Sequence, residues 1–315
     1  MDNFWPEKLT RRAFIKGFGY ATLFTLAGGP LRWRGKEAFA SELRVIENDF
    51  KNPYDVSIDS EDHVLITDSS SYCVFIFTME GEPLKRFGGP GSLLGKFNYP
   101  RGVVADRSGH IYVVDSNNGR VQVFDKGGEP IGSIGTLGGI AGSFFTPQGV
   151  AVDTKGRVYV ADTRNHRIQI FERGRVKGII GEWGDEKAQF RLPTDVAVAP
   201  DGTILVMDSK HGAVKAFTFE GELKYQFGEM GSEKGQFNLA QGMTVDPKGF
   251  VYVADTGNHR IQKFDLTGRF ITAVGTKGNR LGEFNAPTGV AIDKRGRLFV
   301  ADTLNRRIQI LEPLS

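Results

Sequence analysis

The fold of this chain is indicated by the stretch Gly242-Met-Thr-Val-Asp-Pro-Lys-Gly-Phe-Val-Tyr-Val-Ala-Asp-Thr-Gly-Asn-His-Arg-Ile-Gln-Lys-Phe264, which occurs, with variations, six times. In every copy the second apolar run ends at an aspartate. These residues are Asp68, Asp115, Asp162, Asp208, Asp255 and Asp302, so successive copies lie 46 or 47 residues apart. A fixed period of this length indicates a repeat architecture.

Each copy contains short apolar runs separated by turn dipeptides, which is the pattern of strands and hairpins rather than of helices. In the fifth copy the expected strands are 242–245, 251–254, 260–264 and 270–274. Lys248-Gly249 joins the first two strands, where glycine tolerates the positive φ of a tight turn. A four-stranded sheet that is apolar on both faces must stack on copies of itself, and radial stacking gives a β-propeller.

The two ends of the repeated region complete one sheet between them. The first segment, Ser41-Glu-Leu-Arg-Val-Ile-Glu47, has the pattern of a fourth strand. The last segment, Arg307-Ile-Gln-Ile-Leu311, has the pattern of a third strand. Pairing of the chain ends removes the open sheet edges that promote aggregation. The sequence therefore predicts an all-β fold, a six-bladed β-propeller of four-stranded antiparallel blades in which the N-terminal strand completes the last blade. The strands expected in that blade are 288–292, 297–301, 306–311 and 42–47.

Two copies carry a motif that is similar to a known repeat. The NHL repeat, named for its Asn-His-Leu run, resembles Val-Tyr-Val-Ala-Asp-Thr-Gly-Asn-His-Arg-Ile-Gln (251–262) and Val-Tyr-Val-Ala-Asp-Thr-Arg-Asn-His-Arg-Ile-Gln (158–169). The resemblance covers nearly all of the chain from residue 43 onward, and it implies a propeller. It implies no single activity, because NHL propellers include RNA-binding proteins, protein-interaction modules and a few lyases.

Residues 1–40 lie outside the repeat and resemble an export signal. The twin-arginine motif resembles Thr10-Arg11-Arg12-Ala13-Phe14-Ile15-Lys16, a mildly apolar stretch follows over 17–27, and Ala38-Phe39-Ala40 offers a cleavage site. We expect a signal peptide at 1–40 and a periplasmic or otherwise extracytoplasmic propeller at 41–315. An ordinary basic N-terminus is the alternative, and an uncleaved signal would act as an anchor. The apolar stretch is short for a bilayer span, and no transmembrane segment is expected in the mature chain.

The charge balance changes once residues 1–40 are set aside. The whole chain holds 40 basic and 37 acidic residues, a net charge of +3, whereas residues 41–315 hold 33 and 34. A near-neutral propeller lacks the basic face that nucleic-acid binding usually needs, so we expect no nucleic-acid partner. Cys73 is the single cysteine and cannot form an intramolecular disulfide, so we interpret it as a packed thiol.

Several polar residues recur at fixed positions in four copies. A constellation that is repeated around a ring cannot be one active site, so we expect the Asn to favour a tight turn and the Arg to bind carboxylate or carbonyl groups. These structural residues are Asp115, Asn118, Arg120, Asp162, Asn165, Arg167, Asp255, Asn258, Arg260, Asp302, Asn305 and Arg307. Third-strand phenylalanines are expected in the core, at Phe77, Phe124, Phe171, Phe217 and Phe264. Loop phenylalanines are expected as plugs between blades, at Phe97, Phe145, Phe190, Phe237 and Phe284.

Copies one and four depart from this pattern and would lie opposite each other in a six-bladed ring. Both lack the Asn and Arg, and both open their first strand with an aspartate, Asp55 or Asp195, where the other copies have Gly. Because first strands surround the channel, the two carboxylates are expected across its mouth, with a small ligand, a cation or water between them. The alternative is that each accepts hydrogen bonds from nearby backbone. The candidate ligand-binding residues are Tyr54, Asp55, Arg101, Gln148, Asp195 and Gln241.

Long loops from each fourth strand to the next first strand form a second candidate site. Long loops gathered on one face of a rigid scaffold are where propellers bind partners. At one equivalent position three successive loops carry Leu137, Trp183 and Met230. This apolar arc is a candidate surface for docking a protein, and the alternative is that the side chains tuck under neighbouring loops.

The sequence gives little support for an enzyme. Propeller lyases and lactonases hold a metal through channel ligands, and Zn²⁺ needs about three protein ligands. None of the five histidines lies in a first strand or at ligand spacing from another. We therefore expect no metal, no cofactor and no catalytic residue. The sequence favours a monomeric exported propeller that binds an envelope protein or a ligand, and a metal-dependent hydrolase or lyase is the alternative.

Overall fold

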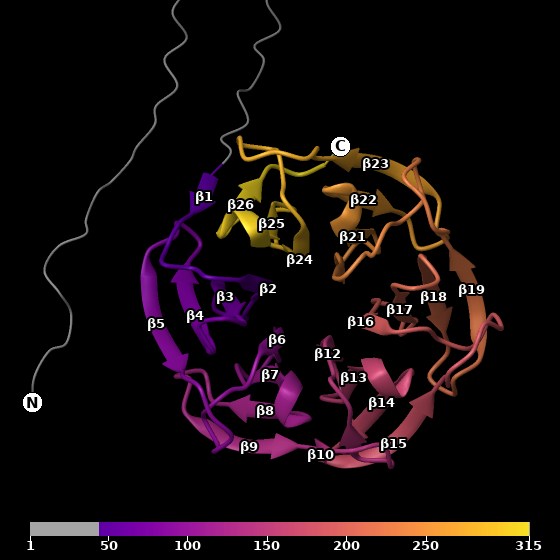
Figure 1. Cartoon of the computed structure of the whole chain (residues 1–315), viewed down its shortest axis with the longest axis horizontal. Helices are drawn as coiled ribbons and strands as arrows, with labels where there is room; N and C mark the ends of the chain where they lie inside the picture. Colours follow the sequence, from indigo (N-terminus) through magenta and orange to yellow (C-terminus); the bar gives the residue numbers. More distant parts are fainter. Residues whose placement is uncertain (1–43, 315) are drawn as a thin grey trace, which may run out of the picture. The chain divides into compact units, whose positions relative to one another are not determined.

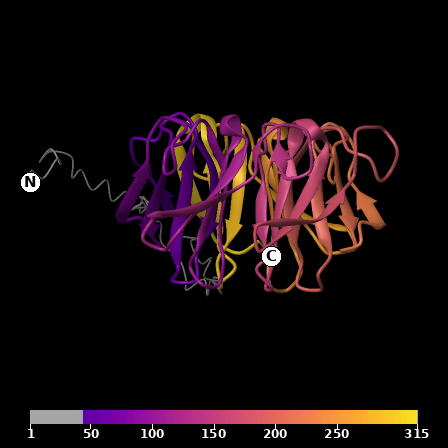
Figure 2. The same cartoon turned by 90° about the horizontal axis from the view of Figure 1, so that it is seen from below.

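The structure, a computed structural model, describes residues 44–314, so the expected signal peptide at 1–40 lies outside the described residues. The described chain forms six four-stranded antiparallel sheets arranged as a ring around a central axis (Figure 1). Seen from the side, the strands run between the two faces of this ring (Figure 2). The prediction of a six-bladed propeller is confirmed.

Within each blade the strands follow one another from the axis to the circumference. The first strands, nearest the axis, are β2 (Pro53–Ile58), β6 (Pro100–Ala105), β12 (Val150–Val152), β16 (Pro193–Val198), β20 (Met243–Val245) and β24 (Pro287–Ile292). The second strands are β3 (His63–Asp68), β7 (Ile111–Asp115), β13 (Val158–Asp162), β17 (Ile204–Asp208), β21 (Val251–Asp255) and β25 (Leu298–Asp302). We number the blades one to six in this order.

The third and fourth strands complete the blades. The third strands are β4 (Cys73–Thr78), β8 (Arg120–Phe124), β14 (Arg167–Glu172), β18 (Ala213–Phe217), β22 (Arg260–Phe264) and β26 (Arg307–Leu311). The fourth, outermost strands are β5 (Pro83–Gly88), β9 (Pro130–Ile134), β15 (Arg175–Ile180), β19 (Leu223–Phe227), β23 (Phe270–Val274) and β1 (Arg44–Ile46). A short parallel pair, β10 (Thr136–Leu137) and β11 (Ser143–Phe144), lies in the connection from blade two to blade three.

The ring closes through the two ends of the described chain. Strand β1 pairs antiparallel with β26, with Arg44 opposite Ile310, Val45 opposite Gln309 and Ile46 opposite Ile308. The sixth sheet thus has the order β1-β26-β25-β24, and β1 lies beside blade six in Figure 1. This confirms that the N-terminal strand completes the last blade.

The hydrophobic core is divided among the six contacts between neighbouring blades, because each blade buries both faces of its sheet. Six clusters of buried apolar side chains each draw on two adjacent blades. The cluster between blades six and one, for example, joins Ile46 and Phe299 to Val64 and Phe77. Since every blade belongs to two clusters, the loss of one blade exposes the faces of both neighbours.

Two sets of phenylalanines pack together inside these clusters. The third-strand residues are buried, and a loop phenylalanine lies against four of them, as in Phe97 and Phe124, whose ring centroids are 5.6 Å apart. One expected plug was wrong. In the connection before blade three the buried ring is Phe144, whereas Phe145 is 44% exposed. The backbone N–H of Phe145 donates to Asp162, which fixes that residue at the polar position of the loop, and its ring meets the Arg164 guanidinium.

A fully buried aspartate at the end of each second strand ties the blade to the preceding connection. In blade five the Oδ2 atom of Asp255 accepts hydrogen bonds from Asn258 (2.9 Å), Arg260 (2.7 Å) and Gln262 (3.0 Å). Its Oδ1 atom accepts the backbone N–H of Asn238 at 2.8 Å. Blades two, three and six repeat this network. Donors on every side satisfy the carboxylate and offset the cost of burying its charge.

Blade one departs from this network because its incoming connection is short. Only residues 47–52 lie between β1 and β2, whereas residues 89–99 lie between β5 and β6. In blade two, Arg120 also binds the carbonyl of Leu93 in the long connection, and blade one has no such carbonyl to bind. Instead Asp68 accepts the backbone N–H groups of residues 51 and 52, and Phe50 packs against Phe75 with centroids 5.2 Å apart.

Blade four keeps the network but changes the donors. Asp208 accepts from His211 Nδ1 at 2.5 Å and from Lys215 Nζ at 2.9 Å. Lys215 is buried and also donates to the carbonyl of Gln189 in the incoming loop. In blades two, three, five and six a glutamine at this position donates to the equivalent carbonyl, as Gln262 does to that of Gln236. His211 Nε2 lies 3.1 Å from Asp185 in the incoming loop. The departures of these two blades therefore have different structural causes.

Candidate functional site on the loop face

One face of the ring carries both candidate sites. The connections from each fourth strand to the next first strand lie there, as do the turns between second and third strands, and we call it the loop face. Four of these turns are single 3₁₀ turns, η1 (Ser116–Asn118), η2 (Thr163–Asn165), η3 (Thr256–Asn258) and η4 (Thr303–Asn305). First strands also begin at this face and lie nearest the axis of the ring (Figure 1), and we call the residues at their starts the channel mouth.

Asp55 and Asp195 each connect their own blade to the next one. Asp55 of blade one accepts the backbone N–H of Val103 in blade two at 3.0 Å. Asp195 of blade four accepts the backbone N–H of Met243 in blade five at 2.7 Å and that of Val196 at 2.9 Å. Both carboxylates are thus held by backbone donors, as the second of the two sequence interpretations anticipates.

The preceding blades leave room for these carboxylates by carrying glycine. A Cβ atom added to Gly149 of blade three would lie 2.1 Å from Asp195 Oδ1, and one added to Gly289 of blade six would lie 2.5 Å from Asp55 Oδ1. Neither distance is possible for real atoms. The glycine in the blade before each aspartate, Gly149 or Gly289, is therefore required by close packing at the axis.

Burial at the axis changes the acidity of both groups. Burial raises the pKa of Asp55 to about 7, although the bonds from Val103 and Val56 oppose the shift. Burial also raises the pKa of Asp195 well above its ordinary value, and the charge of Asp55 raises it further. The negative charge of Asp55 thus opposes the ionisation of Asp195, so the two carboxyl groups do not lose their protons independently.

The four other candidate ligand-binding residues meet at the channel mouth, above the two aspartates. The Tyr54 hydroxyl lies 2.9 Å from Gln148 Oε1 of blade three and 3.1 Å from Gln241 Oε1 of blade five. Arg101 of blade two donates to the same hydroxyl from Nη1 at 3.2 Å. One phenol oxygen thus joins side chains of four blades at the axis. All four side chains remain partly exposed to solvent.

The guanidinium group of Arg101 is held in an unusual environment. It lies over the rings of Tyr54 and Tyr99, at 4.9 and 5.4 Å from their centroids. Its Nε atom is buried and has no hydrogen-bond partner among residues 44–314. Leaving a buried donor unpaired costs roughly 1–3 kcal/mol. Thr194 and Thr288, at the equivalent position in blades four and six, instead bind backbone carbonyls of the next blade.

The apolar arc predicted from the loops is exposed. Leu137, Trp183 and Met230 are 60%, 63% and 49% exposed, so the tucked arrangement is not the one found. Seven further apolar side chains of the loop face are also exposed, and sequence reasoning missed them as a surface. They are Leu93, Leu94, Ile140, Phe145, Leu239, Leu281 and Leu304. We call these ten residues together the apolar rim. Nine of them come from the connections between blades, from every connection except the short one before blade one, and Leu304 comes from the turn η4.

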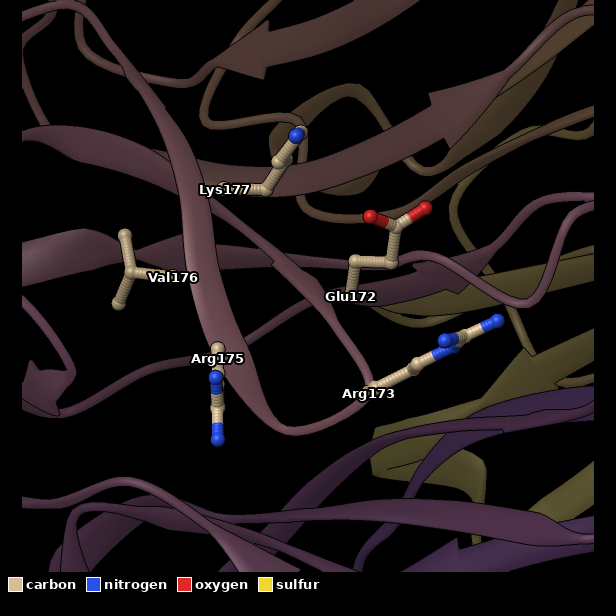
Figure 3. A pocket seen from close by; sticks show the side chains of 5 residues that line it. All are labelled: Glu172, Arg173, Arg175, Val176 and Lys177. Atoms are coloured by element: carbon tan, nitrogen blue, oxygen red, sulfur yellow. The ribbon is translucent and has the colours of Figure 1, made fainter.

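Hollows elsewhere on the surface are shallow and do not gather functional groups. One lies on the β14–β15 hairpin and is lined by Glu172, Arg173, Arg175, Val176 and Lys177. Figure 3 shows these side chains pointing away from one another. A smaller hollow on the loop face lies between Tyr72 and Asn118. Convergent polar groups mark a binding site better than a hollow does, and by that criterion the channel mouth is the stronger candidate.

The described residues give no further support for a metal or membrane site. Between residues 44 and 314, no group of three or more His, Cys, Asp or Glu side chains is arranged to hold a metal ion. That same part of the chain contains no helix with the length and hydropathy of a membrane span. Cys73 is buried, and burial raises the pKa of its thiol to about 11, so it is a poor nucleophile.

Comparison with known proteins identifies the repeat. The family model of the NHL repeat matches the sequence five times, at residues 97–124, 146–171, 190–217, 237–264 and 284–311. These segments run from the loop phenylalanine or the residues just after it to the end of the third strand. No protein of curated function matches the sequence.

Solved structures with the same fold have different activities. A gluconolactonase from Xanthomonas campestris is 14% identical with a TM-score of 0.66, over 86% of this chain and 89% of that one. The virginiamycin B lyase of Staphylococcus aureus is 13% identical with a TM-score of 0.60, over 87% and 99%. An auxiliary nutrient-binding protein of Bacteroides thetaiotaomicron is 15% identical with a TM-score of 0.62, over 83% and 69%. Identities this low carry the fold and no activity.

Proposed function

This chain belongs to the NHL-repeat family of β-propellers, and we propose that it is an exported binding module that holds a partner protein of the cell envelope against its loop face. The apolar rim is the observation that carries this proposal. Of the fourteen large apolar side chains that are exposed among the described residues, ten belong to the rim. Surfaces of this kind, apolar and rimmed by polar groups, are typical of protein-binding sites.

The arrangement of the rim suits a protein better than a small molecule. Nine of its members are spread around the ring on five connections, each anchored by a buried phenylalanine and a buried aspartate, and Leu304 lies in the turn η4. Trp183 and Phe145 also contact arginine side chains, at 5.6 and 5.7 Å from their ring centroids, which limits their motion. Aromatic anchors that are held in place before binding lose little entropy on binding.

A metal-dependent hydrolase or lyase is the second candidate, favoured by the pair of aspartates in the channel and by the activities of proteins with the same fold. Against it, Asp55 and Asp195 both accept backbone hydrogen bonds. Two carboxylates are also fewer than the ligands that Ca²⁺ or Zn²⁺ usually takes. Stoichiometric metal in the purified mature protein would favour the enzyme.

We propose export by the twin-arginine route on the strength of Arg11-Arg12 and the alanines around residue 39. A variant with both arginines replaced by lysine should accumulate in the cytoplasm with residues 1–40 attached. Export that proceeds normally in this variant would contradict the proposed route and leave the binding proposal untouched.

The binding proposal predicts that three substitutions on the rim remove the partner. We expect the triple variant Leu137→Ser, Trp183→Ser, Met230→Ser to lose most of the partner protein that the wild type retains on purification from the envelope. Truncating a central aromatic side chain of an interface alone costs roughly 2 kcal/mol or more, about thirtyfold in affinity.

The control is a triple variant on the outer strands, Leu84→Ser, Ile131→Ser, Ile179→Ser. These side chains are 51%, 55% and 43% exposed, so they match the rim residues in exposure but not in position. We expect this variant to retain the partner. If the two variants retain it equally, or if the outer-strand variant alone loses it, the loop face is not the binding surface.

A further inference from the structure

We propose that the channel mouth binds a carboxylate group, with the guanidinium of Arg101 as its anchor and the carboxamides of Gln148 and Gln241 beside it. The carboxylate belongs either to a small organic anion or to an acidic side chain presented by a docked protein. The proposal rests on the geometry of the mouth and does not depend on the partner proposed for the apolar rim.

Arg101 is the only cation among the six residues of the candidate site, and its charge is uncompensated. In the part of the chain that the structure describes, no carboxylate oxygen lies within ion-pair distance of its guanidinium, and its single side-chain hydrogen bond goes to the neutral Tyr54 hydroxyl. The repeated arginines of the blades, such as Arg260, all bind a buried aspartate instead. A planar guanidinium that has free donors in a partly buried site is suited to a planar carboxylate.

The other groups at the mouth also leave donors for an anion. The Tyr54 hydroxyl has one proton and cannot donate to Gln148 and Gln241 at once, so one carboxamide must turn its NH₂ group toward the phenol or the solvent. The Nε2 atom of Gln148 has no partner among the described residues, and that of Gln241 makes one long bond of 3.3 Å to the carbonyl of residue 239. The mouth therefore presents more donors than acceptors.

The aspartates below the mouth decide between an anion and a cation. Their oxygens accept backbone hydrogen bonds from Val103, Val196 and Met243, which limits their use as cation ligands. Burial raises the pKa of Asp55 to about 7 and that of Asp195 well above its ordinary value, so both groups keep their protons to a higher pH than an exposed carboxyl group does. The other titratable groups around the Tyr54 hydroxyl are Arg101 and Tyr99. As the pH falls and these carboxyl groups take up protons, the positive charge of Arg101 is opposed by less negative charge.

The test is a titration of the purified mature propeller with sodium acetate, followed through the Nε–H resonance of Arg101 in ¹H–¹⁵N NMR spectra. The absence of that resonance in Arg101→Gln assigns it. We expect acetate to shift the resonance to saturation and acetamide, its neutral analogue of similar shape, to leave it in place. For Arg101→Gln the titration is followed through the backbone N–H resonances that acetate shifts in the wild type, and acetate should bind at least about tenfold more weakly, because a charge-assisted hydrogen bond is lost.

The matched control is Arg164→Gln. Arg164 is exposed on the same face, over the ring of Phe145 and away from the channel mouth. This variant should bind acetate as the wild type does. Thermal unfolding of both variants shows whether the fold is retained. The comparison of acetate with acetamide in the wild-type protein tests the proposal even if a variant does not fold.

The pH dependence of the affinity for acetate gives a second readout, which a nonspecific effect of acetate would not reproduce. When the pH rises through about 7, Asp55 ionises and its negative charge should repel the anion. We therefore expect the affinity for acetate to fall between pH 6 and pH 8. An Arg101 resonance that acetate and acetamide shift equally, an affinity that rises with pH, or saturable binding of Ca²⁺ in place of acetate would overturn the proposal.

The source of the carboxylate is distinguished by a capped tripeptide, acetyl-Gly-Glu-Gly-amide, and its glutamine counterpart. If the glutamate peptide binds more tightly than acetate and the glutamine peptide does not bind, the natural ligand is a protein side chain. If acetate binds as well as the glutamate peptide, the ligand is a small anion. Both results support the site, and failure of both the peptide and acetate to bind contradicts it.

Discussion

Deleting residues 41–47 is expected to destabilise the whole propeller, and not only its sixth blade. The deletion removes β1, and with it the buried Ile46 and the three pairings that cover the edge of β26. Truncating a buried isoleucine alone costs roughly 2–5 kcal/mol, and the exposed strand edge adds unpaired backbone groups. A native domain is stable by only about 5–15 kcal/mol, so the loss is a large part of the total.

The measurement is thermal unfolding of residues 41–315 and of residues 48–315, followed by circular dichroism. We expect a single transition in both proteins, shifted to lower temperature in the shorter one. The point variants Ile46→Ala and Glu47→Ala keep the full chain length and show how much of the loss comes from side-chain packing. Ile46 is buried and residue 47 is exposed, so only the first variant should unfold at a lower temperature. An unchanged midpoint for the shorter protein would mean that the ring does not depend on β1.

Replacing Asp255 with alanine is the second change with a large expected effect. The substitution leaves the side-chain donors of Asn258, Arg260 and Gln262 and the backbone N–H of Asn238 without their acceptor. The Arg260 side chain is only 14% exposed, so water cannot fully replace the carboxylate. Breaking a buried ion pair by removing one partner costs roughly 3–5 kcal/mol.

The control is Asp185→Ala, which removes an exposed carboxylate instead of a buried one. Asp185 also contacts an arginine and a histidine, but its side chain is 65% exposed. Exposed ion pairs contribute roughly 0–1 kcal/mol, so this variant should unfold almost as the wild type does. Equal losses for the two variants in chemical denaturation would show that the buried network does not stabilise the blade in the way described.

The period of the sequence was enough to predict the fold, since a ring of equal sheets requires only repeated strands and a way to close. It also identified the Asp, Asn and Arg of the aspartate network, which recur in four blades, but it missed the glutamine that donates to the same carboxylate, such as Gln262. The error at Phe145 came from two adjacent phenylalanines. Each loop phenylalanine lies 18 residues before the blade aspartate, and that spacing from Asp162 selects Phe144.

The candidate site was harder to predict for a physical reason. Equivalent positions show which residues share a level of the ring but not which side chains reach its axis. Tyr54 meets Gln148 and Gln241 across 94 and 187 residues of sequence, and only its length lets it do so. The apolar rim was predicted as an arc of three residues because one loop position was compared at a time. Counting every apolar residue in the loops would have revealed the wider surface.

The proposal that the loop face is the binding surface is tested most directly by site-specific photo-crosslinking in the cells that produce the protein. A photoreactive phenylalanine analogue at position 183 of the rim is compared with the same analogue at position 179 of β15, which is exposed on the circumference. We predict a discrete adduct with a second protein from position 183 and none from position 179. An adduct from position 179 alone, or the same adduct from both positions, would contradict the proposal.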